Sequence, residues 1–362
     1  MGKGFIAAAA IAGAGIAYYL YSRRRKPQPL VEPRHPLLPS LPVLGLGTGG
    51  VPPSEISKPT VESIVAALTN GVRLIDVAEN YGEASLGEGL RQAGFLADAA
   101  FTLCKCDLAP PSLEAPEKRV RRQVMRTLKH VGRSKLDAVV IHWPICLAPV
   151  KSYAEHAEAR KGCWRGLEAL VDEGKIGYIG VSNYTVDLLD ELLSYARIQP
   201  SINEIEFSPA CCQTILVASC YERGIVPIGY SPYGVCWMAG CMGPFYEVKW
   251  GVTVLLEDET VKAIAAEVKA TPAQVLLRHS LQHGVVCIPK SSKPSRVVES
   301  AGVFDVSLSA AQMARLDALT DWRRGTAAAV EAHLKIIASK PYYWDPEISR
   351  VHLGRPWSWR PA

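Results

Sequence analysis

Short apolar runs alternate with helical stretches along most of the 362-residue chain. Eight of these runs are rich in β-branched residues and predict β-strands, at residues 43–47, 73–77, 101–106, 138–142, 177–181, 202–207, 225–230 and 285–289. Several are apolar at nearly every position, which is typical of strands covered on both faces of a parallel sheet. Two of the intervening helices are predicted to begin with capping boxes, in which Thr271 precedes Gln274 and Ser309 precedes Gln312.

Eight strand–helix units in about 280 residues predict an α/β fold, the (β/α)8 TIM barrel. The alternative is an open doubly wound sheet, which would carry a G-x-G-x-x-G loop between its first strand and a helix. The glycines after the first predicted strand, Gly45-Leu-Gly-Thr-Gly-Gly, have a different spacing and lead into Pro52 and Pro53. The pattern therefore favours the barrel, whose functional residues lie on the loops after the carboxyl ends of the strands.

The two ends of the chain depart from this pattern and divide it into residues 1–40, a barrel over residues 41–322, and residues 323–362. Residues 5–21 are apolar and uncharged, and a basic run follows at residues 23–26. Under the positive-inside rule these features predict a transmembrane anchor, with the barrel facing the cytoplasm; the alternative is a segment that targets an organelle. Residues 323–362 are rich in tryptophan and proline, and predict an extension that either packs on the barrel or covers its site.

Composition narrows the possible classes of function. Hydrophobic residues make up 48% of the chain and charged residues 21%, as in ordinary globular proteins. The net charge of +5 comes partly from the single basic run, so it does not indicate a nucleic-acid partner. The ten cysteines contain no C-x-x-C pair. We therefore expect a reduced, intracellular protein without a metal site.

Titratable residues lie at the ends of three consecutive predicted strands. Asp76 lies at the end of the second predicted strand, and Tyr81 follows in the loop after it. Lys105 lies in the third strand, and His142 ends the fourth. Hydride addition to a carbonyl leaves an alkoxide, which a tyrosine can protonate if a neighbouring lysine lowers the tyrosine pKa and an aspartate keeps that lysine charged. A neutral histidine that donates to the carbonyl oxygen would polarise it. The four residues together predict a carbonyl-reducing site.

Each of these residues alone also has a purely structural explanation. Asp76 and Lys105 could be an ion pair inside the barrel, Tyr81 a packing residue, and His142 a hydrogen-bonded core histidine. Their joint placement at consecutive strand ends is what favours the catalytic interpretation.

The motifs around these residues resemble those of the aldo-keto reductases. They span about residues 41–321 and are Gly45-Leu-Gly-Thr, Asp76-x-Ala-x-x-Tyr81-Gly, Lys105, His142-Trp-Pro, Gly174-Lys-Ile-x-x-Ile-Gly-Val-Ser182-Asn183, Tyr230-Ser-Pro and Ile288-Pro-Lys290-Ser291. The resemblance implies that Asp76, Tyr81, Lys105 and His142 form a catalytic tetrad with Tyr81 as the proton donor. It also implies a small-molecule carbonyl substrate that lies against Tyr81, His142 and Trp143.

The same resemblance implies NADPH as the cofactor. The predicted cofactor-binding residues are Ser182, Asn183, Glu204, Tyr230, Ser231, Lys290, Ser291 and Arg296. Ser182 and Asn183 correspond to the pair that binds the nicotinamide carboxamide, and Tyr230 to the ring that stacks on the nicotinamide. Lys290, Ser291 and Arg296 correspond to the residues around the adenosine 2′-phosphate, for which an arginine offers a planar fork of donors. Solvated basic residues are the structural alternative for these cations.

Three positions depart from the family pattern. Gly82-Glu83-Ala84-Ser85 follows Tyr81 where the family often has Gly-x-Glu or x-Asn-Glu, and Gly49-Gly50 stands where an aromatic residue commonly follows Gly-x-Gly-Thr, which predicts a wider substrate pocket on that side. Glu204 stands where the family usually has glutamine, and a carboxylate can accept from the carboxamide nitrogen but cannot donate to its oxygen unless it is protonated.

We therefore predict an NADPH-dependent reductase of aldehydes or ketones. The loop after the seventh strand, residues 232–258, and the tryptophan-rich extension are predicted to form an apolar substrate pocket, with packing of the loop on the barrel as the alternative. Three other functions remain open: a sugar or hydroxysteroid dehydrogenase, a cofactor-sensing partner of a membrane protein similar to the cytoplasmic β-subunits of potassium channels, and a pseudoenzyme disabled by Glu204. The sequence leaves the oligomeric state undetermined.

Overall fold

Eight parallel strands form a single sheet in the order β1 to β8. The computed structural model of the protein describes residues 38, 41–49, 54–146, 154–234 and 255–320. The strands are Gly45–Gly47 (β1), Leu74–Asp76 (β2), Phe101–Leu108 (β3), Leu136–Cys146 (β4), Ile176–Ser182 (β5), Ile202–Glu206 (β6), Val226–Tyr230 (β7) and Val286–Cys287 (β8). All eight predicted strands are present, and β4 extends furthest beyond its predicted limits.

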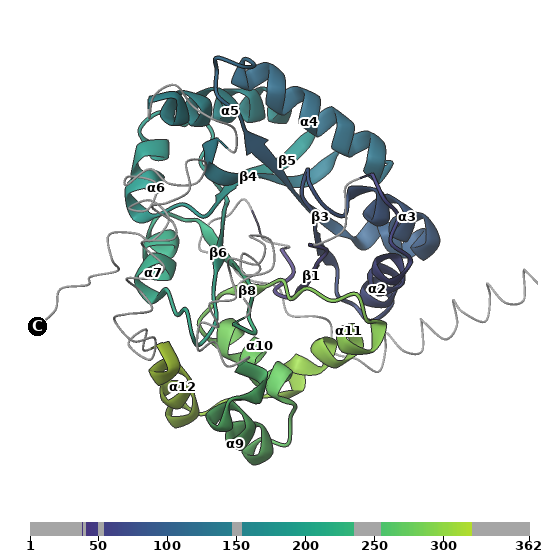
Figure 1. Ribbon diagram of the computed structural model, residues 1–362, viewed down its shortest axis with the longest axis vertical. Helices are drawn as coiled ribbons and strands as arrows, with labels where there is room; N and C mark the ends of the chain where they lie inside the picture. The colour runs from purple at the N-terminus through teal and green to yellow at the C-terminus, as the bar shows by residue number, and fades with distance from the viewer. Residues whose placement is uncertain (1–37, 39–40, 50–53, 147–153, 235–254, 321–362) are drawn as a thin grey trace, which may run out of the picture.

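Helices alternate with the strands and lie around the outside of the ring, as Figure 1 shows. The α-helices are Lys58–Thr69 (α2), Glu83–Ala93 (α3), Pro116–Val131 (α4), Ala154–Asp172 (α5), Val186–Leu193 (α6), Thr214–Glu222 (α7), Glu259–Glu267 (α9), Pro272–Gln282 (α10), Pro294–Ala301 (α11) and Ala310–Asp317 (α12). Short 3-10 helices are Gly94–Ala99 (η1), Leu255–Glu257 (η3), Gly302–Asp305 (η4) and Ala318–Thr320 (η5). Both predicted capping boxes are present, at the starts of α10 and α12.

The ring closes between its first and last strands. Leu44 pairs with Cys287 and Gly47 with Lys290, both in parallel. The Cys287 amide donates to the Val43 carbonyl at 2.9 Å, and the Gly47 amide donates to the Pro289 carbonyl at 3.0 Å. These bonds remove the free edges that an open sheet would leave. The predicted (β/α)8 barrel is therefore confirmed, and the open doubly wound sheet is wrong.

Apolar side chains fill the inside of the barrel. The buried members of this interior cluster are Leu38, Leu41, Leu74, Leu103, Ala138, Val140, Ile202, Val226, Ile228, Val286 and Ile288. Leu41 precedes β1, so this packing begins at the amino ends of the strands. A second cluster lies between the strands and the surrounding helices. The filled interior leaves only the carboxyl ends of the strands for polar groups.

The prediction of a transmembrane anchor requires correction. No helix in the described part of the chain combines the length and the apolar character needed to cross a bilayer. The segment at residues 5–21, on which the prediction depended, lies outside the described residues, as does the extension after Thr320. The length and charge pattern of residues 5–21 did not suffice to establish a spanning helix, because seventeen residues are near the lower limit for one.

Candidate active site

Polar residues form the next layer above the apolar interior. Along a strand every second side chain points to the same side, so each interior residue is followed two positions later by another that faces inward. This spacing relates Leu74 to Asp76, Leu103 to Lys105, Val140 to His142, Ile202 to Glu204 and Ile228 to Tyr230. Five predicted site residues therefore lie in one layer at the carboxyl end of the barrel.

Lys105 lies at the centre of a buried cluster of ionisable groups. Its Nζ donates to the Asp76 carboxylate, donates to the Tyr81 hydroxyl at 3.0 Å, and lies 3.2 Å from Oε2 of Glu204. The Lys105 side chain is only 1% exposed. The structure thus brings together Asp76, Tyr81 and Lys105, as predicted, and adds Glu204 to them.

Burial and charge act in opposite directions on the Lys105 ammonium. Burial alone would lower the pKa of Lys105, but the attraction of Asp76 and then of Glu204 outweighs it, and the pKa is raised well above its ordinary value. The lysine therefore remains an ammonium group and a permanent hydrogen-bond donor to Tyr81.

The pKa of Tyr81 differs from the prediction. Burial and the negative charge of Asp76 raise the Tyr81 pKa far above its ordinary value, although Lys105 opposes them. The sequence identified the neighbour that lowers this pKa but not the larger cost of burying a phenolate. The consequence is a hydroxyl that stays protonated at neutral pH and can serve as a proton donor.

His142 is oriented by a carboxylate that the sequence analysis did not identify. Nδ1 of His142 lies 2.9 Å from Oδ1 of Asp107, a buried residue on β3. Asp107 is two positions after Lys105, so the alternation of the strand was the signal that could have found it. The contact with Asp107 fixes the orientation of the imidazole ring, with Nδ1 turned toward the carboxylate. The role of His142 as a neutral donor to the carbonyl oxygen stays a prediction.

Aromatic rings surround the open side of His142. The Trp143 ring lies 5.8 Å from that of His142, with 27° between their planes, and the Tyr81 ring lies 5.9 Å away at 76°. Trp143 is half-buried at the mouth of the barrel. The predicted substrate-binding residues Tyr81, His142 and Trp143 are thus neighbours. The rest of the predicted pocket, at residues 235–254 and 321–362, lies outside the described residues.

The predicted nicotinamide-binding residues form a connected group at the ends of β5, β6 and β7. The Asn183 side chain donates to the His142 carbonyl at 3.0 Å and accepts from the Tyr230 hydroxyl at 2.8 Å. Ser182 donates to the Glu204 carbonyl at 3.0 Å. Asn183 and Ser231 both adopt the left-handed backbone conformation, with φ of 63° and 52°. Such strain in residues other than glycine clusters at functional sites, where the surrounding structure enforces it.

The predicted phosphate-binding residues lie after β8. Lys290 pairs with Gly47 across the closure of the barrel, and Arg296 is exposed in the first turn of α11. The Ser291 hydroxyl accepts from the Lys293 amide at 3.1 Å. No carboxylate among the described residues forms an ion pair with Lys290, Lys293 or Arg296. Uncompensated cations beside a serine fit a dianionic phosphate.

Glu204 is held as a largely neutral acid. It is 2% exposed, and burial first, then the charge of Asp76, raises its pKa from 4.5 to about 8, against the attraction of Lys105. A protonated carboxyl can donate as well as accept, as the glutamine amide does. The buried environment therefore compensates in part for the departure from the family pattern.

Glu204→Gln should change how stability depends on pH. Because the folded-state pKa is raised, the contribution of Glu204 is fully present below its ordinary pKa of 4.5 and is lost as the pH rises through about 8. Glutamine is isosteric with the protonated acid and does not titrate. We expect nearly equal stability near pH 4 and an advantage of the variant on the order of 4 kcal/mol near pH 8, measured by urea unfolding. The surface variant Glu222→Gln serves as the control, and a constant difference between variant and native protein across this range would contradict the assignment.

Known proteins with sequence similarity cover the barrel. The family model described as Aldo/keto reductase family matches residues 43–321. The glyoxal reductase of Bacillus subtilis (strain 168) is 35% identical over 280 residues, which cover 77% of this chain and 89% of that protein. Aldo-keto reductase family 1 member A1 of Sus scrofa is 33% identical over 297 residues, which cover 77% of this chain and 86% of that protein.

Solved structures also match over most of the chain. An aldo-keto reductase from Bombyx mori, in complex with NADP, superimposes with a TM-score of 0.68 and 26% identity, covering 82% of this chain and 94% of that chain. An aldose reductase from Schistosoma japonicum gives a TM-score of 0.66 and 29% identity, covering 83% and 97%.

Proposed function

This chain belongs to the aldo/keto reductase family, and from that premise we propose that it reduces aldehyde or ketone carbonyls to alcohols with NADPH, using Tyr81 as the proton donor. The observation that carries the proposal is the 3.0 Å contact between Lys105 Nζ and the Tyr81 hydroxyl, inside a buried layer that also holds Asp76. Burial keeps the phenol protonated, and the lysine stabilises the phenolate that remains after transfer.

The site residues divide the reaction between proton transfer and orientation. NADPH, when bound, supplies the hydride that forms the new C–H bond. Tyr81 gives its hydroxyl proton to the carbonyl oxygen as charge develops there, and Lys105 stabilises the resulting phenolate. Asp76 holds the lysine, and Asp107 holds the His142 ring toward the open end of the barrel. Trp143 provides an apolar wall for the substrate.

The residues at the ends of β5 to β8 fit the two ends of NADPH. Asn183 and the protonated Glu204 offer donors and acceptors for a carboxamide, and Tyr230 offers a ring face. The similar structure from Bombyx mori contains NADP, which supports a cofactor of this type. Lys290, Ser291 and Arg296 fit the 2′-phosphate that distinguishes NADPH from NADH.

Arg296→Ala should weaken the preference for NADPH. Loss of a charge-assisted hydrogen bond to phosphate costs about 1.5–3 kcal/mol, so we expect the KM for NADPH to rise about 10–100-fold. The KM for NADH, which lacks this phosphate, should change little. Steady-state kinetics with both cofactors provide the measurement, and Arg165→Ala on α5 is a matched surface control. Equal increases in the KM values for NADPH and NADH would show that Arg296 does not bind the 2′-phosphate.

The proposed activity is tested with the full chain and a panel of aromatic, aliphatic, sugar and steroid carbonyls. The expected result is carbonyl-dependent loss of NADPH absorbance, with the corresponding alcohol identified by chromatography. Tight NADPH binding without turnover on the whole panel would overturn the reductase assignment and favour a cofactor-sensing protein.

A further inference from the structure

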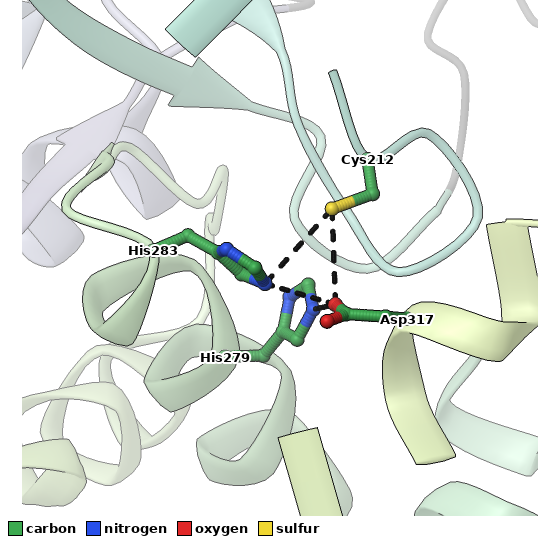
Figure 2. A group of neighbouring side chains, drawn as sticks. All are labelled: Cys212, His279, His283 and Asp317. Carbon is green, nitrogen blue, oxygen red and sulfur yellow. Dashed lines mark hydrogen bonds and ion pairs between the residues drawn. The ribbon is translucent and has the colours of Figure 1, made fainter. Parts of the chain in front are cut away.

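Four potential metal ligands meet on the outside of the barrel. Cys212 lies in the loop between β6 and α7, His279 and His283 lie near the end of α10, and Asp317 ends α12. Figure 2 shows the four side chains pointing toward one another. One possible ligand atom from each residue lies within 4.8 Å of the other three. None of these residues belongs to the proposed reductase site.

The helix geometry explains how the two histidines come together. Residues four apart in sequence lie on the same face of an α-helix, so His279 and His283 project side by side from α10. The Asp317 carboxylate lies between them, with Oδ1 at 2.7 Å from Nε2 of His279 and 2.8 Å from Nε2 of His283. Sγ of Cys212 lies 3.8 Å from the same oxygen and 4.0 Å from Nε2 of His283.

These separations are close to those of a tetrahedral zinc site. With bonds of about 2.1 Å to nitrogen and oxygen and 2.3 Å to sulfur, tetrahedral ligand atoms are about 3.4–3.6 Å apart. The two contacts of Cys212 exceed this by a few tenths of an ångström, and the two carboxylate–imidazole contacts fall short by about 0.6–0.7 Å. The two remaining pairs, which both include His279, lie within 4.8 Å. Binding an ion therefore requires an outward shift of the Asp317 carboxylate and an approach of the other ligand atoms by up to about 1.4 Å.

We propose that Cys212, His279, His283 and Asp317 bind a zinc ion, which joins the β6–α7 loop and α12 to α10. One sulfur, two imidazole nitrogens and one carboxylate oxygen are all zinc ligands, and the combination suits a borderline-soft ion better than Mg²⁺ or Ca²⁺. All four positions of a tetrahedron are filled by the protein, which is the arrangement of a structural site.

The environment of the cluster is suited to holding an ion. His279 is fully buried, and the Phe207 ring lies against it with ring centroids 5.9 Å apart. Cys212, His283 and Asp317 are partly exposed and leave a route for the ion.

The ion would connect segments that are distant in the chain. Cys212 is 71 residues from His283 and 105 residues from Asp317. Cross-links that close long loops remove much of the conformational freedom of the unfolded chain. Binding free energy at such a site therefore contributes directly to folding stability. This role is independent of the proposed reductase activity, and its test does not use turnover.

The test measures zinc and cobalt binding to the full chain after removal of metal by a chelator. We expect about one Zn²⁺ per chain, and with Co²⁺ in its place, the near-ultraviolet charge-transfer band of a thiolate ligand. Cys212→Ser and His283→Gln should each lower zinc affinity more than about 100-fold, since loss of a mere outer-shell partner already costs up to that amount. The melting temperature of the native chain should rise by about 5 °C at zinc a hundredfold above its dissociation constant, and those of the two variants should not.

Cys211→Ser is the matched control, because it removes a thiol from the neighbouring position and leaves all four ligands in place. It should bind zinc as the native chain does. Absence of stoichiometric zinc binding in the native chain would overturn the proposal and leave a hydrogen-bonded cluster around Asp317. A cobalt–thiolate band that persists in Cys212→Ser would also overturn it, because the metal would then be bound elsewhere.

Discussion

Tyr81→Phe is expected to lower kcat for carbonyl reduction by about 10²–10⁴-fold, which is the usual contribution of a positioned general acid. The ring, its packing against His142 and the Asp76–Lys105 ion pair remain in the variant, so only the transferable proton is lost. Because the hydroxyl is not proposed to contact NADPH, the dissociation constant of the cofactor should change little.

The experiment compares single-turnover reduction rates and NADPH binding for the native chain and the variant. Tyr178→Phe is the matched control: it removes a hydroxyl from a tyrosine on β5 that packs against the apolar interior. A Tyr81→Phe enzyme that keeps most of its reduction rate would exclude Tyr81 as the donor, and an equal loss in Tyr178→Phe would indicate a structural effect.

Lys105→Met is expected to destabilise the fold by about 3–5 kcal/mol, the cost of removing one partner from a buried ion pair. The variant leaves the carboxyl groups of Asp76 and Glu204 buried without their shared cation. Glu204 is already largely neutral near pH 7, so the uncompensated charge is mainly that of Asp76. Reduction activity should also fall to background, because Tyr81 loses the ammonium that stabilises its phenolate.

A double variant separates the two effects. Adding Asp76→Asn to Lys105→Met removes the stranded charge, and we expect it to restore a large part of the lost stability but none of the activity. Urea unfolding measures the stability, and Lys135→Met on the surface is the control. If the double variant is no more stable than Lys105→Met, the buried charge is not the source of the destabilisation.

The strands could be predicted because burial on both faces of a barrel strand selects continuous apolar runs. The polar layer could be predicted because Asp76, Lys105 and His142 each follow such a run, and strand alternation fixes the direction of their side chains. Asp107 obeys the same rule, but its contact with His142 joins side chains of two different strands, β3 and β4, which the pattern of one strand does not reveal. The protonation states of Tyr81 and Glu204 depend on how many charges share one buried volume, which no single strand reveals.

The cluster of Cys212, His279, His283 and Asp317 illustrates a different limit of sequence reasoning. A set of ligands with a single cysteine carries no C-x-x-C motif, so the lack of that motif did not exclude a metal site. The i, i+4 histidines of α10 were visible, but Cys212 and Asp317 approach them only through the packing of α12 and the β6–α7 loop. Residues 5–21 show the opposite error, in which a local composition was read as a spanning helix without any packing evidence.

Neighbouring strands of the barrel are joined by unequal numbers of residue pairs. Five residue pairs join β3 to β4 and five join β4 to β5, whereas two join β7 to β8. Between β8 and β1 only isolated bridges close the ring. Two pairs also join β5 to β6, and five join β6 to β7. Lys105 and His142 lie on strands that have five residue pairs with a neighbour, whereas Lys290 and Arg296 follow β8, which has two. The segment proposed to hold the 2′-phosphate is therefore attached to the barrel by fewer backbone hydrogen bonds than the proposed catalytic lysine and histidine, and we expect it to open locally at a lower free energy.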